Sequence, residues 1–146
     1  MEIILYNPEI PPNTGNIARL CAGLEMPLNL IAPLGFSLED RYLKRAGLDY
    51  WPYVNLRVFP DWMAFLKEWT GGRLIGTSAR QGKHFTQYNP ENDDGLVFGK
   101  ETGGLPADLL AKLDLVFNVP LRKEVRSLNL ATTVGFFLGV ALSRKA

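Results

Sequence analysis

The chain has 146 residues, of which 47% are hydrophobic and 21% are charged, and its formal net charge at pH 7 is +1. This balance is typical of one globular domain with a hydrophobic core, and it excludes a global positive field that would draw the protein onto nucleic acid. The single cysteine, Cys21, excludes an internal disulfide and a cysteine zinc site, and we expect it to be a small core residue.

His84 is the lone histidine and lies in a polar segment, where a surface position is expected. Without a second histidine or cysteine, the sequence favours neither thiol catalysis nor a histidine-ligated metal. The chain starts directly with an apolar strand and shows no signal-peptide pattern, and no apolar run is long enough to span a bilayer. We therefore expect a cytoplasmic protein without a metal site or a membrane segment.

The first half of the chain alternates predicted strands with predicted helices. Short apolar or alternating runs predict strands over residues 3–6, 28–32 and 53–59. Helical spacing predicts helices over residues 13–24, 38–47 and 61–69. Asn13 or Thr14 is expected to cap the first of these helices, and Asp61 the third.

The second half continues the same alternation. Strands are predicted over residues 73–77, 95–99 and 115–119, with a helix over 106–113 and a closing helix after Ser127. Residues 78–94 form a long polar segment without a clear pattern, and such loops are often functional. The whole pattern predicts an α/β fold, a parallel sheet with helices on both faces.

The closing helix carries more apolar surface than one core can cover. One stripe contains Leu130, Val134, Phe137, Leu138 and Ala141, whereas Phe136, Val140 and Leu142 face elsewhere. A row of small residues recurs every four positions: Ala131, Gly135, Gly139 and Ser143. Two interpretations stay open: a helix buried inside one domain, or a helix shared between the core and a second subunit.

Two strand-to-helix corners have the ingredients of a binding site. Residues 99–106 (Gly-Lys-Glu-Thr-Gly-Gly-Leu-Pro) let a ligand approach the backbone closely, but their spacing matches neither the dinucleotide fingerprint nor the P-loop. From the residues alone this is either a structural turn or a ligand-binding turn. Residues 120–129 lead into the closing helix, whose first turn offers free N–H donors and a positive dipole end.

Three separated segments resemble the three motifs of the SPOUT RNA methyltransferases. They are residues 13–19 (Asn-Thr-Gly-Asn-Ile-Ala-Arg), 98–106 (Phe-Gly-Lys-Glu-Thr-Gly-Gly-Leu-Pro) and 126–130 (Arg-Ser-Leu-Asn-Leu). The resemblance is closest to the compact branch that methylates the ribose of the wobble nucleotide in tRNA. It covers essentially the whole chain, including residues 8–12 and 45–50.

This resemblance implies a single SPOUT domain over residues 1–146, with a C-terminal trefoil knot. It implies that the loops of the knot bind S-adenosylmethionine, largely through backbone groups. The implied cofactor-binding positions are Thr77, Gly99, Gly104, Val119, Leu121, Ser127 and Leu128. It also implies a homodimer through the first and last helices, in agreement with the excess apolar surface of the closing helix.

The implied reaction transfers a methyl group to a ribose 2′-oxygen, which must be held in line with it at roughly 3–3.5 Å. The resemblance gives Arg19 the central catalytic role. Because a guanidinium stays protonated at neutral pH, we expect Arg19 to anchor a phosphate and stabilise the developing alkoxide rather than accept the proton. Asn16 and Asn129 would orient the reacting group, and Glu101 would orient a loop or a basic partner.

Local basic residues are the candidates for contacts with the tRNA backbone, since the net charge is small. They are Arg41, Lys44, Arg45, Arg80 and Lys83. Three other functions stay open: methylation of a different tRNA or ribosomal RNA nucleotide, a non-catalytic RNA-binding module with the same fold, and a nucleotide-binding regulator. The sequence does not identify the target base.

Overall fold

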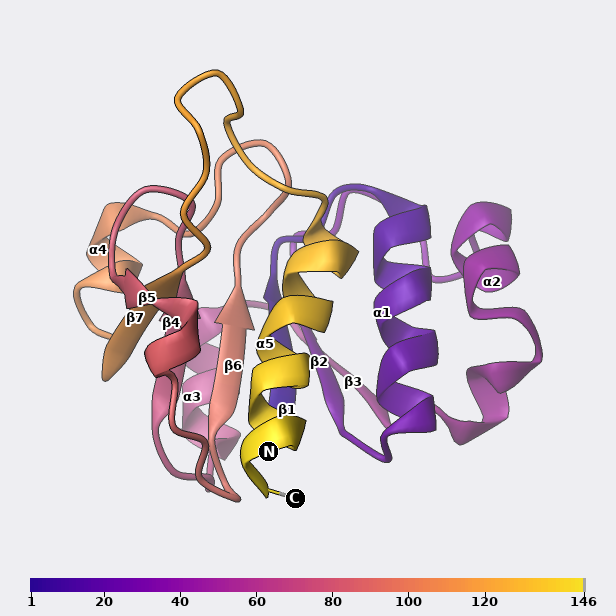
Figure 1. Ribbon diagram of the computed structural model, residues 1–146. Coiled ribbons are helices and arrows are strands. Elements are labelled where there is room, and N and C mark those ends of the chain that lie inside the picture. Colours follow the sequence, from indigo (N-terminus) through magenta and orange to yellow (C-terminus); the bar gives the residue numbers. More distant parts are fainter. Residues whose placement is uncertain (146) are drawn as a thin grey trace.

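A parallel β-sheet runs through the centre of the molecule (Figure 1). The computed structural model describes residues 1–145. Within them seven strands lie in the order β3-β2-β1-β6-β4-β7-β5, and all neighbouring strands are parallel. The strands are β1 (Glu2–Tyr6), β2 (Leu28–Ile31), β3 (Leu56–Phe59), β4 (Leu74–Thr77), β5 (Lys83–His84), β6 (Gly95–Phe98) and β7 (Leu115–Asn118).

Helices cover both faces of the sheet, which confirms the predicted α/β architecture. Successive residues of a strand point to opposite faces, and Ile3 and Ile4 of β1 therefore enter two different buried clusters. The Ile3 cluster contains residues of α1 (Pro11–Gly23) and α5 (Leu130–Lys145), and the Ile4 cluster contains residues of α3 (Trp62–Glu68) and α4 (Ala107–Leu110). The α2 helix (Arg41–Gly47) and the 3-10 helix η1 (Leu48–Tyr53) pack against α1.

The first helix begins earlier than the sequence predicted. It starts at Pro11, and the N-cap is Ile10, which has no side chain that could cap it. The expectation that Asn13 or Thr14 would be the cap is therefore wrong. Proline at the first two helical positions suits the fixed φ of the ring, and it removes two N–H groups that would otherwise need partners.

Local caps and turns explain other differences from the predicted ranges. The α2 helix starts at Arg41 instead of residue 38, because the Asp40 carboxylate accepts hydrogen bonds from the N–H groups of Tyr42 (2.8 Å) and Leu43 (3.2 Å). The third strand begins at Leu56, since residues 48–53 form η1 instead. The Asp61 cap of α3 is confirmed by its bond from the Ala64 N–H at 2.8 Å.

The segment expected to be a long loop contains a further strand. Lys83 and His84 form β5, which pairs with β7 at the edge of the sheet, and residues 85–87 form a short 3-10 turn, η2. His84 is exposed there, as expected. A two-residue edge strand has no hydrophobic periodicity of its own, so only the tertiary pairing with β7 defines it.

The closing helix behaves as its pattern predicts. Its predicted core stripe is buried, at 8% exposure or less for each residue, whereas Phe136 and Leu142 are 40% and 42% exposed. Asn129 caps the helix, because its Oδ1 accepts the Thr132 N–H at 3.3 Å. On α1, Cys21 is fully buried, and burial raises the pKa of its thiol to about 12, as suits a core residue.

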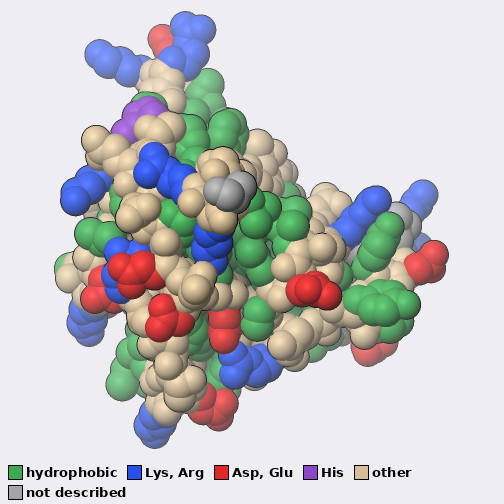
Figure 2. Space-filling model, turned by 60° about the horizontal axis from the view of Figure 1, so that its bottom comes forward, with side chains coloured by type: hydrophobic (Ala, Val, Ile, Leu, Met, Phe, Trp, Pro, Cys, Tyr) green, Lys and Arg blue, Asp and Glu red, His purple; other side chains and the backbone are tan. Residues whose placement is uncertain are grey.

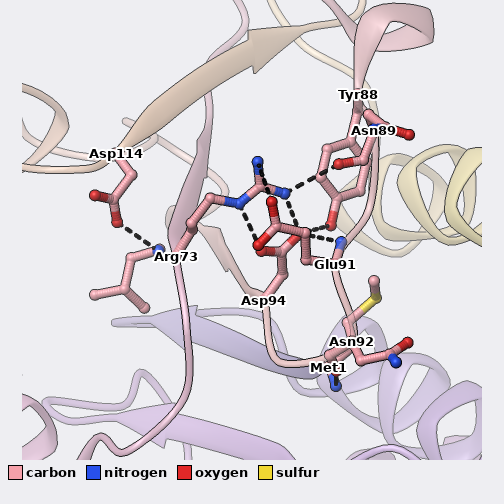
Figure 3. A network of polar contacts seen from close by, with 9 residues as sticks. Met1, Arg73, Tyr88, Asn89, Glu91, Asn92, Asp94 and Asp114 are labelled. Carbon is pink, nitrogen blue, oxygen red and sulfur yellow. Dashed lines mark hydrogen bonds and ion pairs between the residues drawn. The ribbon is translucent and has the colours of Figure 1, made fainter.

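A polar network lies at the amino ends of the central strands β4 and β6 (Figure 3). The side chain of Asp94 is fully buried and accepts two hydrogen bonds from Arg73, at 2.9 and 2.8 Å. Tyr88 donates its hydroxyl to the same carboxylate at 2.7 Å, and the Glu91 N–H donates at 2.9 Å. The network thereby ties the end of segment 78–94 to the start of two central strands.

Candidate cofactor pocket and active site

A pocket of about 850 Å³ lies at the carboxyl ends of β4, β6 and β7. Its walls come from the three loops that follow these strands, over residues 77–81, 98–105 and 119–130, with α4 and α5 behind them. Two of these loops rise above the sheet at the top of Figure 1. The carboxyl ends of adjacent parallel strands are where open α/β sheets bind ligands.

All seven positions expected to bind a cofactor line this one pocket: Thr77, Gly99, Gly104, Val119, Leu121, Ser127 and Leu128. They come from three loops that are far apart in sequence, and the strand order β6-β4-β7 brings them together. Three basic residues that were not among these positions also line the pocket: Arg80, Lys100 and Arg126. Arg80 was expected to contact RNA, whereas Lys100 and Arg126 belong to the second and third motifs but were given no role.

The chemistry of the pocket suits a ligand that is partly apolar and partly polar. Leu105, Leu110 and Phe137 supply apolar surface, and Ser78 and Ser127 supply hydroxyl groups. Residues 121–128 make one backbone hydrogen bond within the described part of the chain, from the Val125 N–H to the Arg122 carbonyl at 3.1 Å. The other backbone donors and acceptors of this loop are therefore available to a ligand.

The glycine-rich turn after β6 is unusually tight. Gly104 has φ +64°, a left-handed conformation that favours glycine, and its N–H bonds to the Lys100 carbonyl at 2.9 Å. A Cβ added to Gly99 would lie 2.1 Å from the carbonyl carbon of Gly104, so the backbone leaves no room for a side chain. These two glycines are what lets the turn fold back over the end of the strand.

Replacing Gly99 with alanine should therefore move the turn and reduce the pocket's affinity for its ligand by about 10-fold or more, since backbone must shift. Gly103→Ala is the matched control, because its added Cβ would meet only the far end of the Lys100 side chain at 3.2 Å. Titration calorimetry with S-adenosylmethionine measures both variants. Equal affinities for the two would contradict this account of the turn.

Glu101 joins the turn to the start of α1. Its carboxylate accepts hydrogen bonds from the N–H groups of Glu9 (2.8 Å) and Ile10 (3.2 Å) and from the Asn13 amide (3.4 Å). Thr102 adds a second link, because its hydroxyl donates to the Glu9 carboxylate at 2.7 Å. These contacts hold the turn after β6 against the start of α1, and the orienting role of Glu101 stays a prediction.

Truncating this carboxylate should loosen the pocket. Glu101→Ala removes hydrogen bonds to a charged acceptor, which are each worth about 1.5–3 kcal/mol. Because the N–H groups of Glu9 and Ile10 can regain water, we expect a loss of about 2 kcal/mol in the free energy of unfolding, measured by urea denaturation. Glu101→Gln, which keeps one acceptor oxygen, should lose less; a larger loss for glutamine than for alanine would argue against this role.

The three residues expected to be catalytic do not lie together on the pocket wall. Asn129 donates its amide to Asn13 Oδ1 at 2.9 Å, which connects it to Glu101 through Asn13 at the rim. Asn16 and Arg19 are exposed on α1, and neither lines the pocket. The Arg19 guanidinium instead lies 5.0 Å above the centre of the Tyr50 ring.

The residues expected to contact RNA fall into two groups. Arg80 lines the pocket and Lys83 is exposed on β5. Arg41, Lys44 and Arg45 are exposed on α2, on the far side of α1 from α5 (Figure 1). In residues 1–145 no cluster of three potential ligands could hold a metal ion, and none of the helices found there is long and apolar enough to cross a membrane.

These features define a class of protein: an α/β fold with a pocket among three loops at the carboxyl ends of its central parallel strands, with basic residues in the pocket wall. Its sequence identifies the family within that class. The SpoU rRNA Methylase family model matches residues 1–139, and the chain belongs to this family.

A curated relative and a solved structure are similar over nearly the whole chain. The tRNA (cytidine(34)-2′-O)-methyltransferase of Burkholderia cenocepacia is 45% identical over 137 residues, which cover 91% of this chain and 88% of the relative. A structure solved in a study of the 2-OH methylation of C/U34 on tRNA is 44% identical, with a TM-score of 0.94, covering 99% of this chain and 95% of that one.

A more distant structure shares the fold alone. The AdoMet-bound rRNA methyltransferase from Sinorhizobium meliloti is 19% identical, with a TM-score of 0.88, and the match covers 99% of this chain and 56% of that one. That protein holds the methyl donor in the same fold.

Proposed function

We propose that the protein is an S-adenosylmethionine-dependent methyltransferase that acts on the ribose 2′-hydroxyl of the wobble nucleotide, position 34, of tRNA. One observation carries this proposal: the seven positions expected to hold the cofactor line a single pocket, in a chain 45% identical to a tRNA (cytidine(34)-2′-O)-methyltransferase. Cytidine or a modified uridine at position 34 is the expected substrate. A protein with this substrate would work in the cytoplasm.

The residues of the pocket fit S-adenosylmethionine. The free backbone groups of residues 121–128 and the Ser127 hydroxyl suit its polar adenosine and amino-acid parts, and Leu105 and Phe137 suit the faces of its adenine ring. When bound, the cofactor supplies an activated methyl group on a positive sulfur. The protein then has to place a ribose oxygen in line with that methyl group and exclude water.

Arg19 and Asn16 act on the substrate side of the reaction. A protonated guanidinium anchors the phosphate beside the reacting ribose and stabilises the negative charge that develops on its 2′-oxygen. The Asn16 amide orients the ribose, and Asn129 holds the rim of the pocket through Asn13. Because neither Arg19 nor Asn16 lines the pocket of its own chain, we propose that they complete the pocket of a second copy.

The exposed face of α5 supports a homodimer through α1 and α5. Phe136 and Leu142 lie on this face beside Gly135 and Gly139, where an added Cβ would meet nothing within 4 Å. A second helix backbone could therefore approach closely and cover the apolar side chains. Sedimentation velocity tests this arrangement, and Gly139→Trp should shift a dimer toward the monomer.

A trefoil knot in the C-terminal part is a further component of this proposal. After β7 the chain returns past β4 and β6 to reach α5, whose Phe137 packs on Phe98 of β6 with ring centres 5.8 Å apart. On the way, residues 120–129 pass beside the loop that follows β6, and the two loops share the pocket. A crystal structure traced through residues 99–129 tests whether one loop threads the other.

Incubation with methyl-labelled S-adenosylmethionine and total tRNA, and in parallel with ribosomal RNA, followed by nucleoside analysis, tests the function. We expect labelled 2′-O-methylcytidine or a 2′-O-methylated uridine from position 34. Label at another tRNA position or in ribosomal RNA would support the related methyltransferases instead. RNA binding without label would support a non-catalytic module, and tighter binding of a mononucleotide than of S-adenosylmethionine would support a regulator.

A further inference from the structure

Three exposed tyrosines lie on the neighbouring elements α2 and η1, outside the pocket. Tyr42, Tyr50 and Tyr53, which we call the tyrosine patch, are 48%, 39% and 74% exposed. They occur within twelve positions of sequence, on elements that pack against the outer side of α1. Large rings this exposed are not needed by the core, which is complete without them, so the patch is available to bind a partner.

Two arginines associate with these rings. The Arg19 guanidinium lies 5.0 Å from the centre of the Tyr50 ring, and that of Arg41 lies 4.8 Å from the centre of the Tyr42 ring. Stacked guanidinium groups and aromatic rings together form a flat, positively charged surface. Through Tyr50, the patch adjoins the arginine that the proposed reaction needs beside the ribose.

The charges around the patch favour an anionic partner. Among residues 1–145, no carboxylate lies within ion-pair distance of Arg19, Arg41 or Arg45. The acidic groups along residues 39–50 are Glu39, Asp40 and Asp49, and Glu39 pairs with Lys44 at 2.6 Å. The four basic groups Arg19, Arg41, Lys44 and Arg45 together exceed these three carboxylates by one positive charge. At the right-hand end of Figure 2, where α2 and η1 lie, Lys and Arg side chains lie among hydrophobic and acidic ones.

We propose that the tyrosine patch binds unpaired nucleotides of the tRNA anticodon loop, next to the nucleotide that is methylated. The rings stack on bases, and Arg41 and Arg45 contact the phosphates between them. Unpaired bases stacked on aromatic and arginine planes are the usual way in which proteins hold single-stranded RNA, whereas a duplex hides those base faces. This inference rests on the proposed function and names how its substrate is held.

The test compares the double variant Tyr42→Ala/Tyr53→Ala with Tyr42→Phe/Tyr53→Phe, which keeps both rings. Fluorescence anisotropy measures binding to a synthetic anticodon stem-loop with cytidine at the wobble position, and to a blunt RNA duplex of the same length. We expect the alanine variant to bind the stem-loop about 10-fold or more weakly, and the phenylalanine variant to bind as wild type. Duplex binding and S-adenosylmethionine affinity should not change.

Met63→Ala controls for the loss of exposed apolar surface, because Met63 is 63% exposed on α3. If the double variant does not fold, Tyr53→Ala alone replaces it in the binding measurement. Wild-type affinity of the alanine variants for the stem-loop would overturn the inference. So would an equal loss on the duplex, or a changed oligomeric state, which would make a second copy the partner. Failure of the wild type to methylate any tRNA would instead overturn the proposed function, so the two failures are distinguishable.

Discussion

Replacing Arg19 with alanine should reduce methyl transfer to tRNA by about 100-fold or more, while the affinity for S-adenosylmethionine stays at its wild-type value. Removing one group that stabilises developing negative charge costs a reaction this much. Cofactor binding should survive because Arg19 is exposed on α1 and lies outside the pocket of its own chain. Single-turnover methyl transfer and calorimetry measure the two quantities separately.

Two variants serve as controls for this prediction. Arg19→Lys keeps the charge but loses the planar fork, and it should recover part of the activity. Lys67→Ala removes one exposed positive charge from α3, on the other face of the sheet, and should leave turnover unchanged. An Arg19→Ala enzyme that turns over like wild type would show that this residue has no part in the reaction.

Mixing subunits tests where Arg19 acts. In a dimer whose active sites combine α1 of one chain with the pocket of the other, Arg19→Ala and Gly99→Ala proteins each have little activity when S-adenosylmethionine is kept well below the Kd of the Gly99→Ala variant. Mixed dimers should regain activity at one of their two sites, because one pocket then meets an intact arginine. Mixtures that stay inactive, although subunit exchange is demonstrated, would place Arg19 and the pocket in the same chain.

Much of the fold follows from local patterns. The six predicted strands are all present, although β3 is shorter than predicted, because short apolar runs between helical segments have few alternatives in a parallel sheet. The stripe of α5 is buried as predicted, since Val134 and Phe137 can reach only one face of the sheet. The start of α1 was missed because the cap preference of Asn13 and Thr14 outweighed the start signal of Pro11 and Pro12. The Asn13 amide instead bonds to Glu101, 88 positions later in sequence.

The candidate site was also predicted from the sequence only in part. The lining positions of the pocket were predicted from the resemblance to known motifs alone, and they lie at the end of β4 and in the loops after β6 and β7. That Arg19 lies apart from them depends on the strand order: β1, which leads into α1, is separated from β4 and β7 by β6. Tyr50 next to Arg19 was also missed, because a contact between α1 and η1 has no local signal in sequence.

Replacing Asp94 with alanine should destabilise the protein by about 3 kcal/mol. Its carboxylate is fully buried, and removing it leaves the Tyr88 hydroxyl without its acceptor and the Arg73 guanidinium with only Glu91 and the Asn89 carbonyl. Removing one partner of a buried ion pair costs about 3–5 kcal/mol, and the lower end applies here because Arg73 is 29% exposed and can regain water. Urea unfolding at pH 7 measures the loss.

The dependence of this loss on pH identifies its cause. Burial by itself raises the pKa of Asp94, but hydrogen bonds from Arg73, from the Glu91 N–H and from Tyr88 outweigh burial and hold that pKa below its ordinary value. A depressed carboxyl pKa adds stability above about pH 4, and this stability is lost as the pH falls further. The difference between wild type and Asp94→Asn should therefore shrink below pH 4.

Asp93→Asn is the matched control, because Asp93 is the exposed neighbour and its carboxylate makes no ion pair in residues 1–145. It should change the free energy of unfolding by no more than about 0.5 kcal/mol.

Folded Asp94→Ala protein should still bind S-adenosylmethionine with wild-type affinity. The network lies at the amino ends of β4 and β6, whereas the pocket lies at the carboxyl ends of these strands. A loss of affinity at temperatures where the variant is fully folded would instead mean that the network positions the pocket loops, including Arg80, through segment 78–94.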